Sequence, residues 1–142
     1  MTAALKAEPS PRKPVTLIGQ LSIVESGYPV KKAMNLVNTI SPKDMAFRKR
    51  IFSTATLTRS RAANQDDVRL KKALSEKIAR IERIWERVLK IYNHDEVAAR
   101  EFLFRPHLML DDRSPIDVAL LGETGAVFLN SVLDTIEYNF AA

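Results

Sequence analysis

The chain has 142 residues, a formal net charge of +5 and 46% apolar residues, enough for a packed core, which excludes global disorder. It has no cysteine, which excludes disulfides, thiolate catalysis and cysteine-ligated zinc. No apolar run approaches the ~20 residues of a membrane span, and the N-terminus lacks the apolar core of a signal peptide, so we expect a soluble, cytoplasmic protein without membrane contact.

The net charge hides an asymmetry along the chain. Residues 1–94 carry 19 lysines and arginines against 8 acidic residues, a net charge of +11, whereas residues 95–142 carry a net charge of −6. Two interpretations remain open. The two parts form differently solvated faces, or they serve two partners, a polyanion for the basic part and a basic surface for the acidic part.

Helical spacing of apolar residues is common and strand-like alternation is scarce, so we expect an all-α fold. Residues 1–14 are predicted to form a flexible arm, because they hold three prolines, four charges and little apolar content. Residues 15–65 are predicted to form a region like a helix-turn-helix. Residues 66–93 should form a long central helix, and residues 94–142 a compact helical domain.

Within the first region, residues 15–29 fit either a strand or a short helix, and a helix is predicted from Val30 to Ile40. Ser41-Pro42-Lys43-Asp44 then reads as a helix start with serine as the N-cap. The inward residues of this second helix are predicted to be Met45, Ile51 and Phe52.

A third short helix, capped by Thr54 or Thr56, follows after a tight link. Two such helices suit a helix-turn-helix module, in which hydroxyls bond phosphates and arginines bond phosphates or guanine edges. The candidate DNA-binding residues are Thr56, Thr58, Arg59, Ser60 and Arg61.

The central helix is predicted from an apolar stripe in which residues recur every three or four positions. The stripe consists of Leu70, Leu74, Ile78, Ile81, Trp85, Val88 and Tyr92. From Leu74 onward the steps follow heptad spacing, so the stripe is either the core of the chain itself or a dimer seam.

A further helix is predicted to start near Asp95 or Glu96, with Val97, Phe102 and Leu103 facing inward. Ser114-Pro115-Ile116-Asp117 repeats the helix-start signal of residues 41–44 and should open a short helix that ends at Gly122.

The final helix should place Phe128, Val132, Ile136 and Phe140 on one side, with Leu129 and Leu133 widening that stripe. An apolar chain end of this kind docks either on the protein itself or in a groove of a partner.

Catalytic and metal-binding constellations are not found in the sequence. His94 and His107 are the only histidines, and neither has the partner four residues away that a zinc-binding helix requires. Asp111 and Asp112 lack the further ligands of a calcium loop. We therefore expect neither an enzyme nor a protein that uses a cofactor.

Several motifs in residues 86–140 occur together in one order. They are Pro106, Leu110, Ser114-Pro115-Ile116-Asp117, Gly125-Ala126 and Ile136-Glu137-Tyr138. With these motifs the chain resembles the Xre/MbcA/ParS-type antitoxins, the partners of RES-domain toxins. Upstream, Thr56-Leu57-Thr58-Arg59 is similar to a pattern in the helix-turn-helix of that family. Phe102 stands where many members have tryptophan, and Asn139 where glycine is usual, although asparagine still permits a turn.

The resemblance implies an antitoxin whose C-terminal domain binds a RES-domain toxin that degrades NAD, with the chain end near or in the substrate pocket. It also implies a homodimer within a toxin–antitoxin complex and repression of its own operator DNA. The candidate toxin-binding residues are Pro106, Leu110, Asp112, Ser114, Asp117, Asp134, Glu137, Tyr138, Asn139 and Phe140.

The residue types agree with that implication. A pocket for an anionic dinucleotide should be basic, and acidic residues such as Asp134 and Glu137 would complement it, while Tyr138, Asn139 and Phe140 would fill it. The alternative is a stand-alone helix-turn-helix transcriptional regulator whose C-terminal domain only oligomerises.

Overall fold

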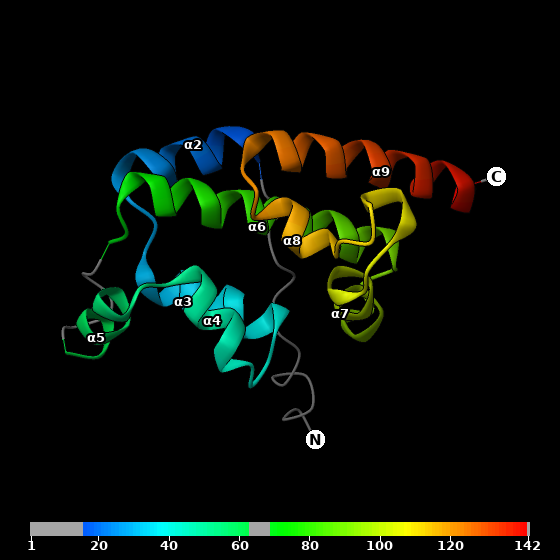
Figure 1. Ribbon diagram of the computed structural model, residues 1–142. Coiled ribbons are helices and arrows are strands. Elements are labelled where there is room, and N and C mark those ends of the chain that lie inside the picture. Colours follow the sequence, from blue (N-terminus) through cyan, green and yellow to red (C-terminus); the bar gives the residue numbers. More distant parts are fainter. Residues whose placement is uncertain (1–15, 63–68, 142) are drawn as a thin grey trace, which may run out of the picture.

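A computed structural model describes residues 16–62 and 69–141, with the side chains of 59–62 and 141 left out, and these residues form an all-α fold, as predicted (Figure 1). The helices are α2 (Leu17–Ser26), α3 (Val30–Ile40), α4 (Met45–Ile51), α5 (Thr54–Ala62), α6 (Lys72–Ile91), α7 (Glu96–Phe104), the 3-10 turn η1 (Leu108–Leu110), α8 (Pro115–Ala119) and α9 (Glu123–Ala141). Among the described residues, extended pairing is limited to isolated bridges. The predicted arm, residues 1–14, lies outside the described part of the chain.

Helix α6 is the central element. Figure 1 shows α2 and α9 along one side of it and α3 and α4 on the other, and α6 contacts α2, α3, α7, α8 and α9. Its predicted stripe is buried within the chain, with Ile78, Ile81, Trp85 and Val88 at most 1% exposed. The heptad-spaced residues are therefore core, because neighbouring helices of the same chain already cover them.

The central helix is shorter than predicted. It begins at Lys72, because the chain before it is extended and the Leu70 N–H donates to the Tyr28 carbonyl oxygen at 2.9 Å. Leu70 is buried but lies before the helix, and residues 66–68 lie outside the described part.

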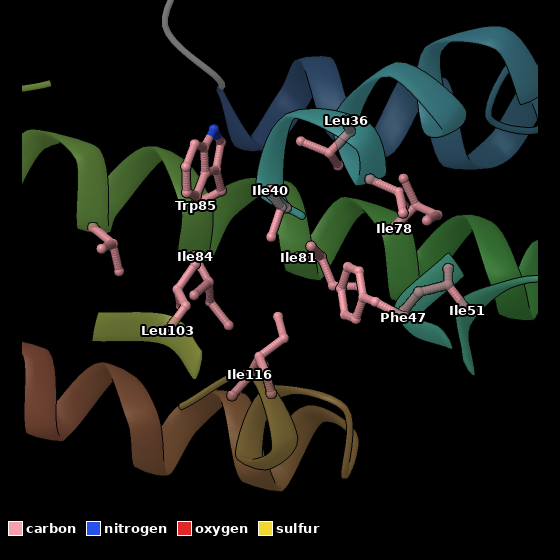
Figure 2. Close-up of a cluster of buried hydrophobic side chains, with 14 of the residues drawn as sticks. Leu36, Ile40, Phe47, Ile51, Ile78, Ile81, Ile84, Trp85, Leu103 and Ile116 are labelled. Atoms are coloured by element: carbon pink, nitrogen blue, oxygen red, sulfur yellow. The ribbon is translucent and has the colours of Figure 1, made fainter. Parts of the chain in front are cut away.

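The core gathers side chains from both halves of the sequence. Figure 2 shows residues of α3, α4, α7 and α8 packed around those of α6. The labelled members are Leu36, Ile40, Phe47, Ile51, Ile78, Ile81, Ile84, Trp85, Leu103 and Ile116. Burial of apolar surface at about 25 cal/mol per Å² holds these helices together.

The ambiguous segment 15–29 contains the helix α2, which Thr16 caps by accepting a hydrogen bond from the Gly19 N–H at 3.0 Å. Helix α3 matches the predicted range from Val30 to Ile40.

The two Ser-Pro-x-Asp segments start helices differently. In the second, Ser114 is the N-cap, as predicted, and its hydroxyl accepts from the Asp117 N–H at 3.3 Å. In the first, the prediction is wrong, because Asp44 is the N-cap and accepts from the N–H groups of Ala46 and Phe47. Lys43 adopts a positive φ of 62°, so the chain turns there before the helix begins.

Several predicted inward residues point outward. Met45 is 45% exposed because the helix begins later than expected, and Phe47 takes the buried position instead. Val97 is 61% exposed in the first turn of α7, although that helix begins where predicted, at Glu96, with Asp95 as its N-cap. Thr54 and Thr56 do not cap α5. Ser53 does, because its hydroxyl accepts from the Thr56 N–H at 3.2 Å.

The inner face of α9 is predicted correctly at four positions and wrongly at two. Leu129, Val132 and Leu133 are buried and Ile136 is half-buried, whereas Phe128 is 51% and Phe140 62% exposed. Gly125 lies on the inner face, so close to α8 that a Cβ there would sit 2.0 Å from the Val118 carbonyl oxygen. Leu129, Val132 and Leu133 follow Gly125 by four, seven and eight positions, so they share its face of the helix and point toward the core.

Candidate functional site

The loop between α7 and α8 has a well-defined backbone. His107 and Arg113 form an antiparallel bridge, in which the His107 N–H donates to the Arg113 carbonyl oxygen at 3.1 Å. Asp111 and Asp112 both adopt the left-handed conformation, which aspartate tolerates better than most residues. The turn exposes Leu108 and Met109, which are 86% and 52% accessible, while Leu110 is buried beneath them.

A row of aromatic rings connects this loop to the end of α9. His107 lies 4.8 Å from the Phe102 ring, Phe102 lies 5.7 Å from Tyr92, and Tyr92 meets Phe140 edge-on at 5.9 Å between centroids. Burial raises the pKa of Tyr92, and the charge of Arg105 lowers it by less. The loop and the C-terminal turn of α9 are therefore neighbours at one end of the molecule.

Helix α9 continues without interruption to Ala141, so no turn forms at Asn139. Its final turn is the most exposed part of the predicted site, with Tyr138 75% and Phe140 62% accessible. The chain end thus docks partly on the protein itself, through Phe140 against Tyr92, and leaves aromatic surface open to solvent.

The acidic residues of α9 face arginines of α6. The Arg87 guanidinium binds Asp134, Glu137 and Asn130, and Arg80 binds Glu123 at 3.3 Å. Burial lowers the pKa of Arg87, but hydrogen bonds to Asp134 and Glu137 outweigh it, and the net pKa is raised.

Asp117, the last residue of the second helix-start motif, also pairs with the basic part of the chain. It lies 2.6 Å from Arg50 of α4, and both side chains are nearly half exposed. Burial raises the pKa of Asp117, but hydrogen bonds with Arg50 and Ser114 lower it by more. Basic and acidic parts of the sequence therefore meet within one chain, an arrangement that neither interpretation of the charge asymmetry included.

The predicted toxin-binding residues divide into three groups. Leu110 and Ser114 are buried and support the fold. Asp117, Asp134 and Glu137 are paired with arginines. The exposed ones without such a pair are Pro106, Asp112, Tyr138, Asn139 and Phe140.

Exposed apolar residues of the C-terminal region were missed by sequence reasoning. They are Leu108, Met109, Leu121, Val127 and Phe128, all more than half exposed. Leu108 and Met109 had a signal that could have identified them, because they stand between a proline and two aspartates in a segment with no helical spacing. Phe128 had none, since its outward position depends on the contact of Gly125 with α8.

The predicted DNA-binding residues lie on α5, which follows α4 after Phe52 and Ser53. Thr58 is exposed. Thr56 is buried at 8% exposure, and its hydroxyl lies 3.0 Å from that of Ser53, so it supports the start of α5 and does not present a free hydroxyl. The side chains of Arg59, Ser60 and Arg61 lie outside the described residues.

Within the described part of the chain, no cluster of three or more metal-ligating side chains is found. Across residues 16–62 and 69–141, no helix combines the length and the apolar character that a membrane crossing needs.

Comparison with known families gives one match. Residues 88–138 match the family model of the antitoxin Xre/MbcA/ParS C-terminal toxin-binding domain, which confirms for this part of the chain the resemblance drawn from its motifs. Comparison with curated proteins and with solved structures gives no significant match. The matched segment runs from the end of α6 to the last turn of α9 and contains the loop, the rings of Tyr92, Phe102 and His107, and the paired carboxylates. The family match supports an antitoxin role for the chain, with a toxin as its partner.

Proposed function

We propose that this chain inhibits a RES-domain, NAD-degrading toxin by placing the end of α9 in the active site of the toxin. We further propose that residues 94–142 act as the toxin-binding domain and that the antitoxin works as a homodimer in the cytoplasm. The RES partner and the NAD chemistry follow from the family resemblance.

One observation carries the proposal. The last turn of α9 is a continuous helix whose aromatic residues Tyr138 and Phe140 are mostly exposed, and it follows directly on the segment that matches a toxin-binding domain, whose last matched residue is Tyr138. Aromatic side chains supply large contact area at low entropic cost and dominate many protein interfaces. Large exposed apolar residues grouped at one end of a small protein are typical of a docking surface.

The loop supplies a second part of the proposed surface. Leu108 and Met109 project from a backbone that is fixed by the bridge between His107 and Arg113. The exposed carboxylates Asp111 and Asp112 beside them suit a toxin whose pocket is basic enough to hold a dinucleotide. In this arrangement the tail excludes NAD and the loop docks at the rim of the pocket.

A titration tests the proposal. The chain is added to a purified RES-domain toxin while NAD consumption is measured. We expect stoichiometric inhibition by the full chain and at least about 10-fold weaker inhibition by a chain that ends at Glu137, a truncation that keeps the partners of Arg87. Ile18→Ala is the matched control, because Ile18 is 81% exposed on α2, outside the matched segment. Full inhibition by the truncated chain would contradict the occlusion mechanism.

DNA binding by α4 and α5 is the second part of the proposal. The net charge of +11 in residues 1–94 and the short link between the two helices support operator binding and autorepression. An electrophoretic shift with operator DNA should weaken when Arg59 and Arg61 are changed to alanine. If DNA is bound but the toxin is not, the stand-alone transcriptional regulator becomes the better description.

A further inference from the structure

Arg87 makes an unusually complete set of contacts with one helix. Its Nη1 donates to the backbone carbonyl oxygen of Asn130 at 3.1 Å and to the Oδ1 of the same residue at 3.0 Å. Its Nη2 donates to Glu137 at 3.2 Å and to Asp134. These contacts span two turns of α9, from position 130 to position 137, and end one residue before the exposed tail.

The tail of α9, residues 138–141, has few contacts with the rest of the protein. Among the described side chains that follow the half-buried Ile136, the ring contact with the rest of the protein is that of Phe140 with Tyr92. Figure 1 shows the end of α9 extending past the neighbouring helices. A terminal helical turn with little packing beneath it frays, and a frayed tail must be ordered when it binds.

We propose that Arg87 positions residues 138–141 for toxin docking, and that Asp134 and Glu137 anchor the tail to α6 instead of contacting the toxin. This inference rests on the proposed function, because it names what prepares the tail for that partner. It replaces the role that the sequence suggested for Asp134 and Glu137.

The geometry favours an internal anchor over a contact with the toxin. A toxin arginine would have to displace the guanidinium of Arg87, whose side chain is 25% exposed and which already binds both carboxylates. Multidentate bonds between arginine and carboxylates are the stronger kind of ion pair, and here the backbone of Asn130 fixes the guanidinium as well. Pre-organising a binding segment raises affinity because less conformational entropy is lost on binding.

The first experiment needs no toxin. Hydrogen–deuterium exchange of the full chain compares wild type with Arg87→Ala, Arg87→Lys and Arg83→Ala. We expect exchange of the amides of residues 138–141 to accelerate about 10-fold in Arg87→Ala, because the anchor is lost, and less in Arg87→Lys, which keeps the charge but not the fork of donors.

Arg83→Ala is the matched control. Arg83 lies on the same helix, but it approaches Glu123 at the other end of α9, at 3.9 Å, so the tail should exchange as in wild type. Unchanged protection of the α6 amides shows that the core is intact. Tail exchange in Arg87→Ala equal to that of wild type would overturn the proposal.

The second experiment measures affinity for a purified RES-domain toxin in a double-mutant cycle. The variants are Arg87→Ala, the double substitution D134N/E137Q, and all three changes together. If the carboxylates act only through Arg87, each variant binds about 10-fold more weakly and the combination is no weaker than either. If the carboxylate changes weaken binding further in the Arg87→Ala background, they contact the toxin and the proposal is wrong. Failure of wild type to bind the toxin would refute the proposed function, while the exchange result still decides the anchor.

Discussion

The two Ser-Pro-x-Asp segments, one before α4 and one before α8, are nearly identical in sequence but begin their helices in different ways. In the second, the residue after proline is Ile116, which is 1% exposed and packs into the core, so the helix starts at Pro115. In the first, that residue is Lys43, which stays at the surface with a positive φ, and the helix starts at Met45.

The comparison teaches that a capping signal specifies where a helix can start and that the neighbouring apolar residue selects the actual position. The C-terminal region and the proposed DNA-binding region also differ in how their helices pack. Helices α8 and α9 contact each other and α6, whereas among the described side chains of α5, residues 54–58, the apolar residue packed against the core is the half-buried Leu57. The C-terminal region is thus defined by packing, and the proposed DNA-binding helix mainly by its charge.

The largest expected effect is that of Gly125→Ala. The new Cβ would lie 2.0 Å from the Val118 carbonyl oxygen, so α9 must move away from α8. We expect a loss of about 3 kcal/mol in the free energy of unfolding and a fall of about 10 °C in Tm. Thermal unfolding followed by circular dichroism measures it, with the exposed Thr124→Ala as control. A variant as stable as wild type would show that the two helices are not in such close contact.

Salt should weaken the binding of DNA and the binding of the toxin to different extents. Raising salt from about 50 to 200 mM should weaken DNA binding about 100-fold, because phosphate contacts release counterions, but should weaken toxin binding only a few-fold, because apolar contacts dominate the tail. Fluorescence anisotropy with each partner measures both. A steep salt dependence for the toxin would instead point to the acidic loop as the main contact.

The two helix starts themselves can be compared by substitution. Ser114→Ala removes the N-cap of α8 and should lower the free energy of unfolding by about 1 kcal/mol. Ser41→Ala removes only a hydrogen bond to the Asp44 carboxylate and should cost at most about half as much. Urea unfolding midpoints give the two values, and equal losses would contradict the different roles of the two serines.

The smallest effect on the free energy of unfolding is expected at Asp117, which joins the C-terminal region to α4 through its ion pair with Arg50. Its pKa is lower in the folded chain than in the unfolded one, so the ion pair with Arg50 stabilises the fold at neutral pH, and this stabilisation is lost as the pH falls through the folded pKa. Both groups are nearly half exposed, so Asp117→Asn should cost less than about 1 kcal/mol at pH 7. The difference from wild type should disappear once the pH falls below the lowered folded pKa of Asp117, as urea unfolding across pH would measure.

Sequence alone determined much of this protein. Helical spacing fixed the all-α class and the buried stripe of α6, because residues three and four apart share a face in any helix. Ser114 was identified as a cap and the start of α7 was placed near Asp95 or Glu96 from local chemistry, and the ordered motifs around Pro106, Ser114 and Gly125 identified the toxin-binding segment.

Tertiary structure decided what depends on contacts between distant residues. It placed the acidic residues of α9 against α6, packed Gly125 against α8 while Phe128 faces solvent, and exposed Leu108 and Met109 beside a buried Leu110. Charge counts and apolar spacing cannot reveal these features, because an ion pair 47 residues apart and a 2.0 Å approach are set by the packing of whole helices.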